Sequence, residues 1–537
     1  MKFINLFLLL LIFYGCDSFD IDRIKHERDN ELDPNKLLEM VATPIIFPES
    51  ILHTNSVSVN ILCSTPGATI YWTTNNGVTW TTGYNFILST GSLLIAKAKK
   101  SGMIDSLEAT NQYNIVYNFS RTYGGNFVDE GKIVQKTSDG GFIIGGGTSS
   151  FGSDDIWIIK LGKDFNIEWQ KTYGGDNLDD LDIENGIGKS EGICETSDAG
   201  YVVAGYTKSF GDSDGDVWVL KLNRDGNINW QKRYGGDSFD CAYSIQQTSD
   251  GGYIVAGLTW SFGYQGSLLV LKLNSSGEIQ WAKIYGGNSY DYGYSIKEVS
   301  TGGYIVVGQT YSFGGNGDIW VLRLNNDGTI AWQKRYGGNG DDRAYSIIEV
   351  SDGFIVVGDS GYSGCVLKIR SNDNGSIESS QIYSNDNCYI RLYSIQQIPE
   401  GYLIVGKKGF GIGEEAGKGN GLILKISNNN ELNIIFQKSY GTEGGDDTFC
   451  SIQDTADGGF VALGYTDSFS ESVDLWVVKL FSNGYLTSLL FNENIFSSYP
   501  YFDSYDTSCV PVDVSLTVED TYCNTYNTSA TITQQAP

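Results

Sequence analysis

The sequence predicts an all-β protein, in which an immunoglobulin-like β-sandwich precedes a seven-bladed β-propeller closed by an N-terminal strand. Three observations support this prediction. Seven copies of a unit of about 50 residues follow one another from about Asn114 to Leu490. Each copy contains four strand-like runs separated by turn signals, and the region shows no sustained helical periodicity. A repeat of this length that is built from strands is typical of propeller blades.

A tyrosine marks the same position in every copy, and successive tyrosines lie 47 to 61 residues apart. These marker tyrosines are Tyr123, Tyr173, Tyr234, Tyr285, Tyr336, Tyr383 and Tyr440. The fourth copy shows the pattern of one unit clearly. Its four predicted strands are Tyr294–Ile296, Tyr304–Gly308, Asp318–Leu324 and Ile330–Tyr336. Glycine-containing turns separate them, as antiparallel strands require.

The fourth-strand pattern occurs once more than seven units need. It appears before the first complete unit, at residues 115–123, and after the last third strand, at residues 484–491. The N-terminal copy keeps both the marker tyrosine, Tyr123, and the aromatic residue four positions before it, Phe119. We therefore predict that residues 115–123 pair with residues 474–480 and close the ring. Residues 484–491 should lie outside the blade or form only an edge.

The N-terminus has the features of an export signal. An apolar run from Leu6 to Tyr14 is too short to span a bilayer but suits a signal peptide, and Gly15 and Cys16 follow it. This ending resembles the lipobox of bacterial lipoproteins, although Phe13 stands where that motif usually has an aliphatic residue. The resemblance implies a signal peptide over 1–16, a lipidated Cys16 and a tether over 17–40. An ordinary secretory signal with an incidental cysteine is the alternative.

Residues 41–113 form the predicted sandwich, because short alternating runs are separated there by Pro, Gly and Asn-Gly turns. The segments Ala42–Pro44, Cys63–Thr74 and Ile95–Gly102 resemble the C-terminal β-sandwich of chitobiase and β-hexosaminidase. In that family the module is a non-catalytic accessory of secreted glycosidases and surface proteins. The resemblance therefore implies an extracellular setting and suggests glycans.

The propeller region, 114–491, resembles a repeat of secreted and surface proteins of bacteria and archaea. The resemblance rests on pieces such as Trp230–Gly236 and Ser249–Gly257. Some relatives are described as endoglucanase-like or quinoprotein-like, but the resemblance assigns no catalytic residue to this chain. Residues 492–537 form a C-terminal tail with short strands.

Charge and histidine content exclude several classes of function. With 64 acidic and 36 basic residues, the formal net charge of −28 disfavours nucleic acids and anionic lipid headgroups. Membrane attachment must then come from the lipid on Cys16. The only histidines, His26 and His53, precede the propeller, which excludes a histidine-based triad or metal site within it. We expect a monomer.

Nine cysteines are few for this length. Cys509 and Cys523 flank a strand-like segment of the tail, so a disulfide between them is a candidate in an oxidising compartment. Cys365 and Cys388 are a second, weaker candidate pair.

An aspartate recurs six residues after the marker tyrosine. The series is Asp129, Asp179, Asp240, Asp291, Asp342 and Asp446, and Tyr389 breaks it. These side chains could form a ring that collects cations at one face. We favour the alternative that each aspartate accepts backbone N–H hydrogen bonds at a loop-to-strand junction, because a residue repeated in every unit is needed by every unit.

Candidate sites lie where the units differ. Asp212, Asp214 and Asp216 have the spacing of a calcium loop, although a solvated turn explains them as well and is the interpretation we favour. Candidate ligand-binding residues are Trp260, Tyr264, Asp179, Asp180 and Asp182, the last three at an acidic insert. Apart from calcium, no cofactor is predicted.

These observations favour a cell-surface or periplasmic lipoprotein that acts as a non-catalytic binding platform for glycans or envelope proteins. A glycan-active hydrolase that uses two aspartates on one propeller face is an alternative. A purely structural envelope component is a further one.

Overall fold

The computed structural model describes two compact units, which divide the chain between Val116 and Tyr117. The described residues are 40–48, 52–54, 57–88, 92–116, 119–181, 191–211, 214–313, 316–338, 340–371, 373–385, 388–410, 418–442, 444–469 and 472–484, together with six short strands between 496 and 534. All regular structure in these residues is β, as predicted. The described part of the chain has no helix with the length and hydropathy of a membrane span.

The first unit contains two sheets. One comprises β1 (Ile45–Phe47), β3 (Val57–Leu62) and β6 (Asn85–Leu88). The other comprises β2 (Leu52–Thr54), β8 (Ala109–Val116), β7 (Ser92–Lys99), β4 (Thr69–Thr73) and β5 (Thr81–Thr82), in that order across the sheet. Alternate residues of β3 are buried, so one face of its sheet is apolar. Trp72 of β4 stacks on Phe86 of β6, with ring centroids 3.8 Å apart, and this contact joins the two sheets.

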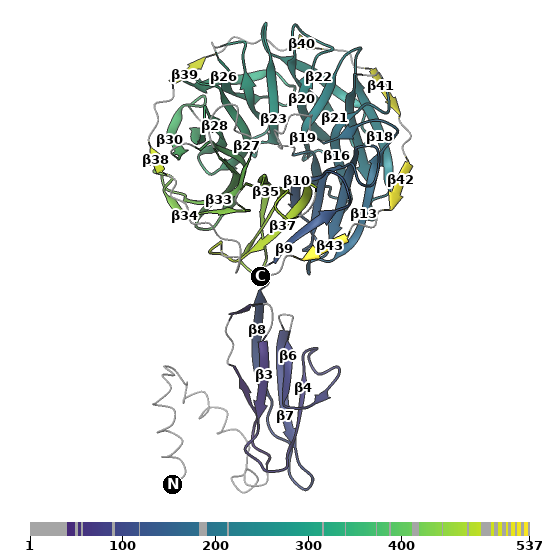
Figure 1. Cartoon of the computed structure of the whole chain (residues 1–537), viewed down its shortest axis with the longest axis vertical. Coiled ribbons are helices and arrows are strands. Elements are labelled where there is room, and N and C mark those ends of the chain that lie inside the picture. The colour runs from purple at the N-terminus through teal and green to yellow at the C-terminus, as the bar shows by residue number, and fades with distance from the viewer. Residues whose placement is uncertain are drawn as a thin grey trace. The chain divides into compact units, whose positions relative to one another are not determined.

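The second unit is a β-propeller, a ring of sheets whose strands follow one another antiparallel (Figure 1). Its described residues form seven sheets. The first four sheets contain β10 (Asp129–Lys136), β11 (Phe142–Thr148), β12 (Asp155–Leu161) and β13 (Ile167–Gly174); β14 (Asp179–Asp180), β15 (Ile193–Glu195), β16 (Tyr201–Thr207), β17 (Asp216–Leu222) and β18 (Ile228–Gly235); β19 (Asp240–Gln247), β20 (Tyr253–Thr259), β21 (Ser267–Leu273) and β22 (Ile279–Tyr285); and β23 (Asp291–Glu298), β24 (Tyr304–Thr310), β25 (Asp318–Leu324) and β26 (Ile330–Gly337).

The fifth to seventh sheets repeat this order. They contain β27 (Asp342–Val350), β28 (Gly353–Ser360), β29 (Ser363–Arg370) and β30 (Ile377–Ser384); β31 (Ile390–Ile398), β32 (Gly401–Gly409), β33 (Gly419–Ser427) and β34 (Ile434–Tyr440); and β35 (Asp447–Asp454), β36 (Phe460–Thr466), β37 (Asp474–Leu480) and β9 (Phe119–Gly124). The first strand of each sheet lies towards the middle of the ring (Figure 1). The second and third strands read as apolar runs because both of their faces are covered by neighbouring sheets.

The seventh sheet takes its fourth strand from the N-terminal end of the unit. β9 pairs antiparallel with β37, and Thr122 lies opposite Trp476. The indole Nε1 of Trp476 also donates a 2.7 Å hydrogen bond to the hydroxyl of Ser120. This is the predicted pairing across the ring. Residues 485–491 of the competing segment lie outside the described residues.

Six short C-terminal strands each pair with the outermost strand of one sheet of the ring (Figure 1, yellow). The sixth sheet has no such strand among the described residues. The six strands are β38 (Phe496–Ser498), β39 (Asp503–Asp506), β40 (Val512–Asp513), β41 (Thr517–Asp520), β42 (Asn524–Asn527) and β43 (Thr531–Gln534). They pair with β30, β26, β22, β18, β13 and β9 respectively, so the tail passes around the ring. Each covers an outer edge that would otherwise offer unpaired backbone groups.

The marker residues of the repeat hold neighbouring sheets together. The hydroxyl of Tyr173 donates a 2.6 Å hydrogen bond to the carbonyl oxygen of Gly226, in the last turn of the next sheet. Trp169 covers the same turn, and its Nε1 donates to the carbonyl of Arg224 at 3.1 Å. Gly226 has a φ of +73°, and a β-carbon there would lie 2.7 Å from the Trp169 ring. The recurring aromatic pair is therefore structural.

Candidate ligand-binding face

The recurring aspartates have the structural role that we favoured. Each is the first residue of a first strand and is fully buried. Each accepts a backbone N–H bond of 2.8–2.9 Å from the second glycine after the marker tyrosine: Gly125 to Asp129, Gly175 to Asp179, Gly236 to Asp240, Gly287 to Asp291 and Gly338 to Asp342. In the seventh sheet Asp447 holds this position, accepting from Ser468 at 2.7 Å, whereas Asp446 pairs with Lys407. Assigning Asp446 to the series was wrong, because that loop is one residue longer.

The acidic candidates that the structure describes, Asp179, Asp180, Asp214 and Asp216, do not form one cluster. Asp179 is buried as described, Asp180 is half-buried in β14, and Asp182 lies outside the described residues. Asp214 is an exposed turn residue, and Asp216 is buried and paired with Arg233 at 2.6 Å. Asp212 lies outside the described residues. No group of three or more His, Cys, Asp or Glu side chains with metal-binding geometry occurs in the described part of the chain.

The structure tests one of the two predicted cysteine pairs. Cys365 is buried and Cys388 is half-buried, and both are free thiols, so the weaker candidate disulfide is wrong. Cys365 lies in β29, opposite Gly358 and Ile382, where it fills a core position. Cys16, Cys509 and Cys523 lie outside the described residues.

Trp260 belongs to a run of aromatic side chains at one end of the propeller. We call this end the loop face, because the loops before the first strands and after the second strands form it. Neighbouring loops are joined there by backbone hydrogen bonds, such as Trp260 N to Phe239 O at 2.8 Å and Tyr311 N to Tyr290 O at 2.9 Å. Trp260 is 53% exposed, Tyr264 in the same loop 80%, and Tyr290 38%. An exposed aromatic surface of this kind is typical of a binding site.

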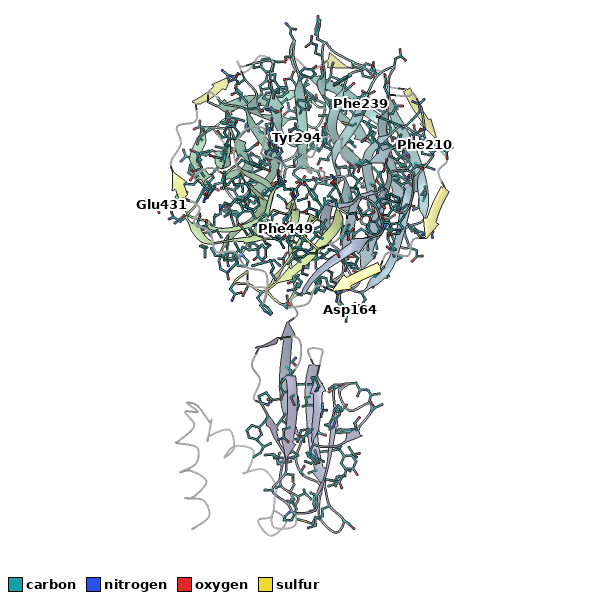
Figure 2. All side chains as sticks on the ribbon, viewed as in Figure 1. Asp164, Phe210, Phe239, Tyr294, Glu431 and Phe449 are labelled. Atoms are coloured by element: carbon teal, nitrogen blue, oxygen red, sulfur yellow. The ribbon has the colours of Figure 1, made fainter. Side chains whose placement is uncertain are left out.

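The rings of this run contact one another from the surface into the fold. The centroids of Phe239 and Trp260 lie 6.2 Å apart, and those of Trp260 and Tyr290 lie 6.3 Å apart. Tyr290 stacks on Tyr292 at 6.4 Å, and Tyr292 stacks on Tyr294 at 5.7 Å. Figure 2 shows Tyr294 beside the middle of the ring and Phe239 farther out. These ring contacts restrict the rotation of the exposed side chains of Trp260 and Tyr290.

A polar group lies next to the aromatic run. The amide of Gln309 and the hydroxyl of Tyr311 both donate to Asp341 Oδ1, at 2.6 and 2.8 Å, and Arg343 pairs with Asp341 Oδ2. Tyr311 connects this group to the run through its bond to the Tyr290 backbone. Aromatic surface and oriented hydrogen-bonding groups therefore meet between the third and fifth sheets. We name Trp260, Tyr264, Tyr290, Tyr311, Asp341 and Arg343 the loop-face site.

Arg343 is itself held from below. Its Nη1 lies 3.6 Å from Asp359, and Arg391 of the next sheet lies 3.5 Å from the same carboxylate. Asp359 is only 1% exposed, and two guanidinium groups offset its charge. Arg343 therefore bridges a buried carboxylate and the half-exposed Asp341, which orients both groups at the face.

β-bulges in the first strands of six sheets build the middle of the ring, and the one in β10 lies between Gly131 and Ile133. The strand register shifts between Ala242 and Ser244, and at the equivalent positions of β23, β27, β31 and β35. The bulged tyrosines are Tyr243, Tyr294, Tyr345 and Tyr393, which pack together in one buried cluster. Burial raises the pKa of the neighbouring Tyr292 to about 12, so its hydroxyl remains protonated at neutral pH.

A cavity of about 190 Å³ lies on the ring axis beside these tyrosines, and the first strands of all seven sheets line it. Glu191 enters it from the second sheet. Its carboxylate accepts hydrogen bonds from Ser295 and Lys297 at 2.7 Å each, and from Ser346 at 3.0 Å. Ser244 of the third sheet also donates to it at 3.4 Å, so one side chain joins four sheets at the centre of the ring. The cavity is smaller than the sites that hold drug-sized ligands.

Sequence reasoning found Trp260 and Tyr264 but missed Tyr290, Asp341 and Glu191. The usable signal was variation between units: the residue directly before the first strand is apolar in the first three sheets, at Val128, Leu178 and Phe239, but is Tyr290 and Asp341 in the next two. Glu191 follows the acidic insert. The hydrogen bond between Tyr311 and Asp341 depends on the relative positions of two adjacent sheets. The sequence of a single unit does not specify those positions.

Comparisons with known proteins give the following results. The sequence matches no family model and no curated protein. Three solved structures of Sqt1 from Chaetomium thermophilum, one of them bound to the N-terminus of the ribosomal protein L10, are similar to the chain at 12% identity and a TM-score of 0.40. The similarity covers 67% of this chain and 97%, 98% and 99% of the three Sqt1 chains.

Proposed function

We propose that this chain is an exported lipoprotein, anchored through Cys16, whose propeller is a non-catalytic binding platform for glycans. In this proposal an immunoglobulin-like sandwich carries a monomeric, seven-bladed ring that residues 119–124 close. The anchor places the protein at the cell surface or in the periplasm. The observation that carries the proposed function is the loop-face site, where exposed, immobilised aromatic rings adjoin pre-oriented hydrogen-bonding groups.

The composition of the loop-face site favours an uncharged saccharide. A sugar ring has an apolar C–H face that packs on aromatic side chains, and hydroxyl groups that exchange hydrogen bonds with carboxylate and guanidinium groups. Trp260 and Tyr290 supply the aromatic planes, and Asp341 and Arg343 supply the polar groups. The net charge of −28 disfavours polyanionic glycans. The sandwich's resemblance to an accessory module of glycosidases agrees with this ligand class.

A glycan-active hydrolase is the second candidate. Two carboxylates, Asp341 and the buried Asp359, do lie next to Arg343 at the loop face. Glycoside hydrolysis, however, needs one carboxylic acid that protonates the leaving oxygen. Both carboxylates here are ion-paired with Arg343, which suits binding better than proton donation.

A glycan array tests the proposal. Neutral and anionic glycans would be probed with the purified full chain lacking the signal peptide, with Trp260→Ala, and with Tyr84→Ala as a control for an exposed aromatic residue in the first unit. The proposal predicts that the wild type and Tyr84→Ala bind neutral glycans and that Trp260→Ala does not. Absence of glycan binding, together with capture of a protein partner that Trp260→Ala abolishes, would replace the glycan with a protein ligand. Release of free sugar from a bound glycan would favour the hydrolase.

A further inference from the structure

Neighbouring sheets of the ring bring two carboxylates together around a glycine. Where the first and second sheets meet, Asp155 begins a third strand and Asp179 begins the next first strand. A β-carbon on Gly174 would collide with Asp155 Oδ1 and lie 2.9 Å from Asp179 Oδ2. The two acids therefore lie on either side of one small residue. Both are nine-tenths or more buried.

Sister junctions of the same ring place a cation beside such a pair. Asp216 and Asp240 flank Gly235 in the same way, and there Arg233 donates to Asp216 at 2.6 Å. Asp318 and Asp342 flank Gly337, and there Arg335 pairs with Asp318. Both arginines stand one residue before the marker tyrosine, opposite a tryptophan of the third strand.

An arginine occurs at this position only where the third strand begins with an aspartate. Where the third strand begins with serine or asparagine, the position is uncharged: Ser267 occurs with Ile284, Ser363 with Ile382, and Asn420 with Ser439. Repeats of one chain thus act as internal comparisons. They associate the guanidinium with the aspartate whose charge it offsets.

Two junctions have an aspartate pair but no arginine. Between the seventh and first sheets Thr122 takes the arginine position, and the hydroxyl of Ser472 donates to Asp474 Oδ1 at 3.4 Å. The junction of the first and second sheets is the other. Thr172 takes the arginine position, opposite Trp157, so the two aspartates meet without a guanidinium. Asp155 Oδ1 and Thr172 Oγ1 are both buried, and neither has a hydrogen-bond partner among the described residues. Burial, and then the charge of Asp179, raise the pKa of Asp155 to about 6. Threonine is also much smaller than arginine, so it leaves the space of the missing side chain.

We propose that the junction formed by Asp155, Thr172 and Asp179 binds a calcium ion, which takes the place of the guanidinium of the sister junctions. Asp155 Oδ1 and Thr172 Oγ1 are oxygen donors, the ligand type that calcium prefers. Two carboxylates balance the charge of a divalent ion. Asp179 keeps its bonds from Gly175 N at 2.8 Å and Ser209 Oγ at 2.6 Å, which orient its carboxylate.

Magnesium fits the junction less well. It requires near-ideal octahedral geometry and retains several waters, whereas calcium accepts irregular sets of protein oxygens. The site lies between two sheets rather than in the Asp212–Asp216 turn, so it is distinct from the calcium loop that the sequence suggests. It is also remote from the loop-face site in sequence and independent of the proposed glycan ligand.

The test compares thermal unfolding of the full chain in chelator and in about 1 mM calcium chloride, together with the calcium that remains bound after gel filtration. The wild type should gain about 2 °C or more in Tm with calcium and retain about one ion per chain. Thr172→Arg should raise Tm in chelator and lose the calcium response. Asp155→Asn should lose the response as well.

Arg233→Thr is the reciprocal variant. It places threonine at the arginine position of the junction between the second and third sheets, as Thr172 is placed at the junction of the first and second. It should gain a second calcium-dependent increase in Tm. A wild-type Tm that calcium does not change would overturn the proposal, as would a response that persists in both Thr172→Arg and Asp155→Asn. A rise in Tm between pH 7 and pH 5 in chelator, with no calcium effect at either pH, would show that a proton neutralises Asp155 instead.

Discussion

The hydroxyl of Tyr234 donates a 2.6 Å hydrogen bond to the carbonyl oxygen of Gly277, which belongs to the following sheet. The same bond joins Tyr285 to Gly328 at 2.6 Å and Tyr383 to Leu432 at 2.7 Å. Six of the seven marker tyrosines therefore join one sheet to the next, and Tyr123 is the exception. This relationship explains why the repeat can be recognised from the sequence.

Replacing Tyr234 with Phe should destabilise the propeller by about 1–3 kcal/mol, because a buried carbonyl loses its partner. Tyr123→Phe is the matched control. The hydroxyl of Tyr123 has no hydrogen-bond partner among the described residues, and Arg121 donates instead to the carbonyl of Phe165 at 2.8 Å. Its cost should stay below about 0.5 kcal/mol. Equilibrium urea unfolding measures both, and equal losses would contradict the assignment.

Ring closure should depend on β9. Deleting residues 115–123 exposes the edge of β37 and removes the Trp476–Ser120 hydrogen bond, so we expect aggregation on size-exclusion chromatography and a large loss of Tm. Deleting residues 531–537 removes only β43, which pairs with the other side of β9. That variant should remain monomeric. A monomeric, stable product of the first deletion would contradict this account of closure.

Glu191 should stabilise the centre of the ring. Glu191→Gln keeps the size of the side chain but removes the charge that Lys297 and three serines contact, at an expected cost of about 1–3 kcal/mol. Glu278→Gln breaks an exposed ion pair, with Lys232 at 3.2 Å, and should change stability by less than about 0.5 kcal/mol. Denaturant unfolding of both variants shows whether the central carboxylate contributes more to the free energy of unfolding than the carboxylate of Glu278 does.

Stability should be greatest in mildly acidic solution. Burial raises the pKa of Asp342 and Asp447 to about 6, so the folded state binds more protons than the unfolded state between about pH 4 and 6, and stability rises as pH falls through this window. Asp139 and Asp250 behave oppositely. Hydrogen bonds and a lysine outweigh burial and lower their pKa to about 2, so their contribution is lost as pH falls below about 4.

The measurement is Tm in chelator from pH 3 to 8, for the wild type and for Asp342→Asn. The amide can still accept the Gly338 N–H bond at this position but cannot titrate. The variant should therefore lose part of the increase between pH 7 and 5. A wild-type Tm that falls steadily from pH 7 to 5 would contradict the direction of these pKa shifts.

Much of the fold could be predicted from local pattern. The third and fourth strands of the fourth unit, the role of the recurring aspartates and the pairing of β9 with β37 all follow from repeated residues whose environment is the same in each sheet, whereas β23 extends beyond the predicted Tyr294–Ile296 at both ends. The displacement from Asp446 to Asp447 shows the limit of counting along the chain, because one extra residue in a loop changes which side chain reaches Ser468.

The candidate site was less accessible to sequence reasoning. Trp260 was found because it departs from the repeat, but its partnership with Tyr290 and the link through Tyr311 to Asp341 join loops of different sheets. The bulges that turn Tyr294 and Tyr345 towards the ring axis leave no separate mark in a pattern of alternating residues. The sequence shows these residues, but it does not show the strand register that brings their side chains together.

The most direct test of the central claim is the affinity of the loop-face site for a neutral glycan, measured by isothermal titration calorimetry with the glycan that the array identifies. Trp260→Ala should raise the Kd at least about 10-fold, because truncating a central aromatic contact removes a large share of the binding energy. Tyr84→Ala should leave the Kd unchanged. A Trp260→Ala variant that binds the glycan as tightly as the wild type would show that the ligand lies elsewhere and would contradict the proposed function.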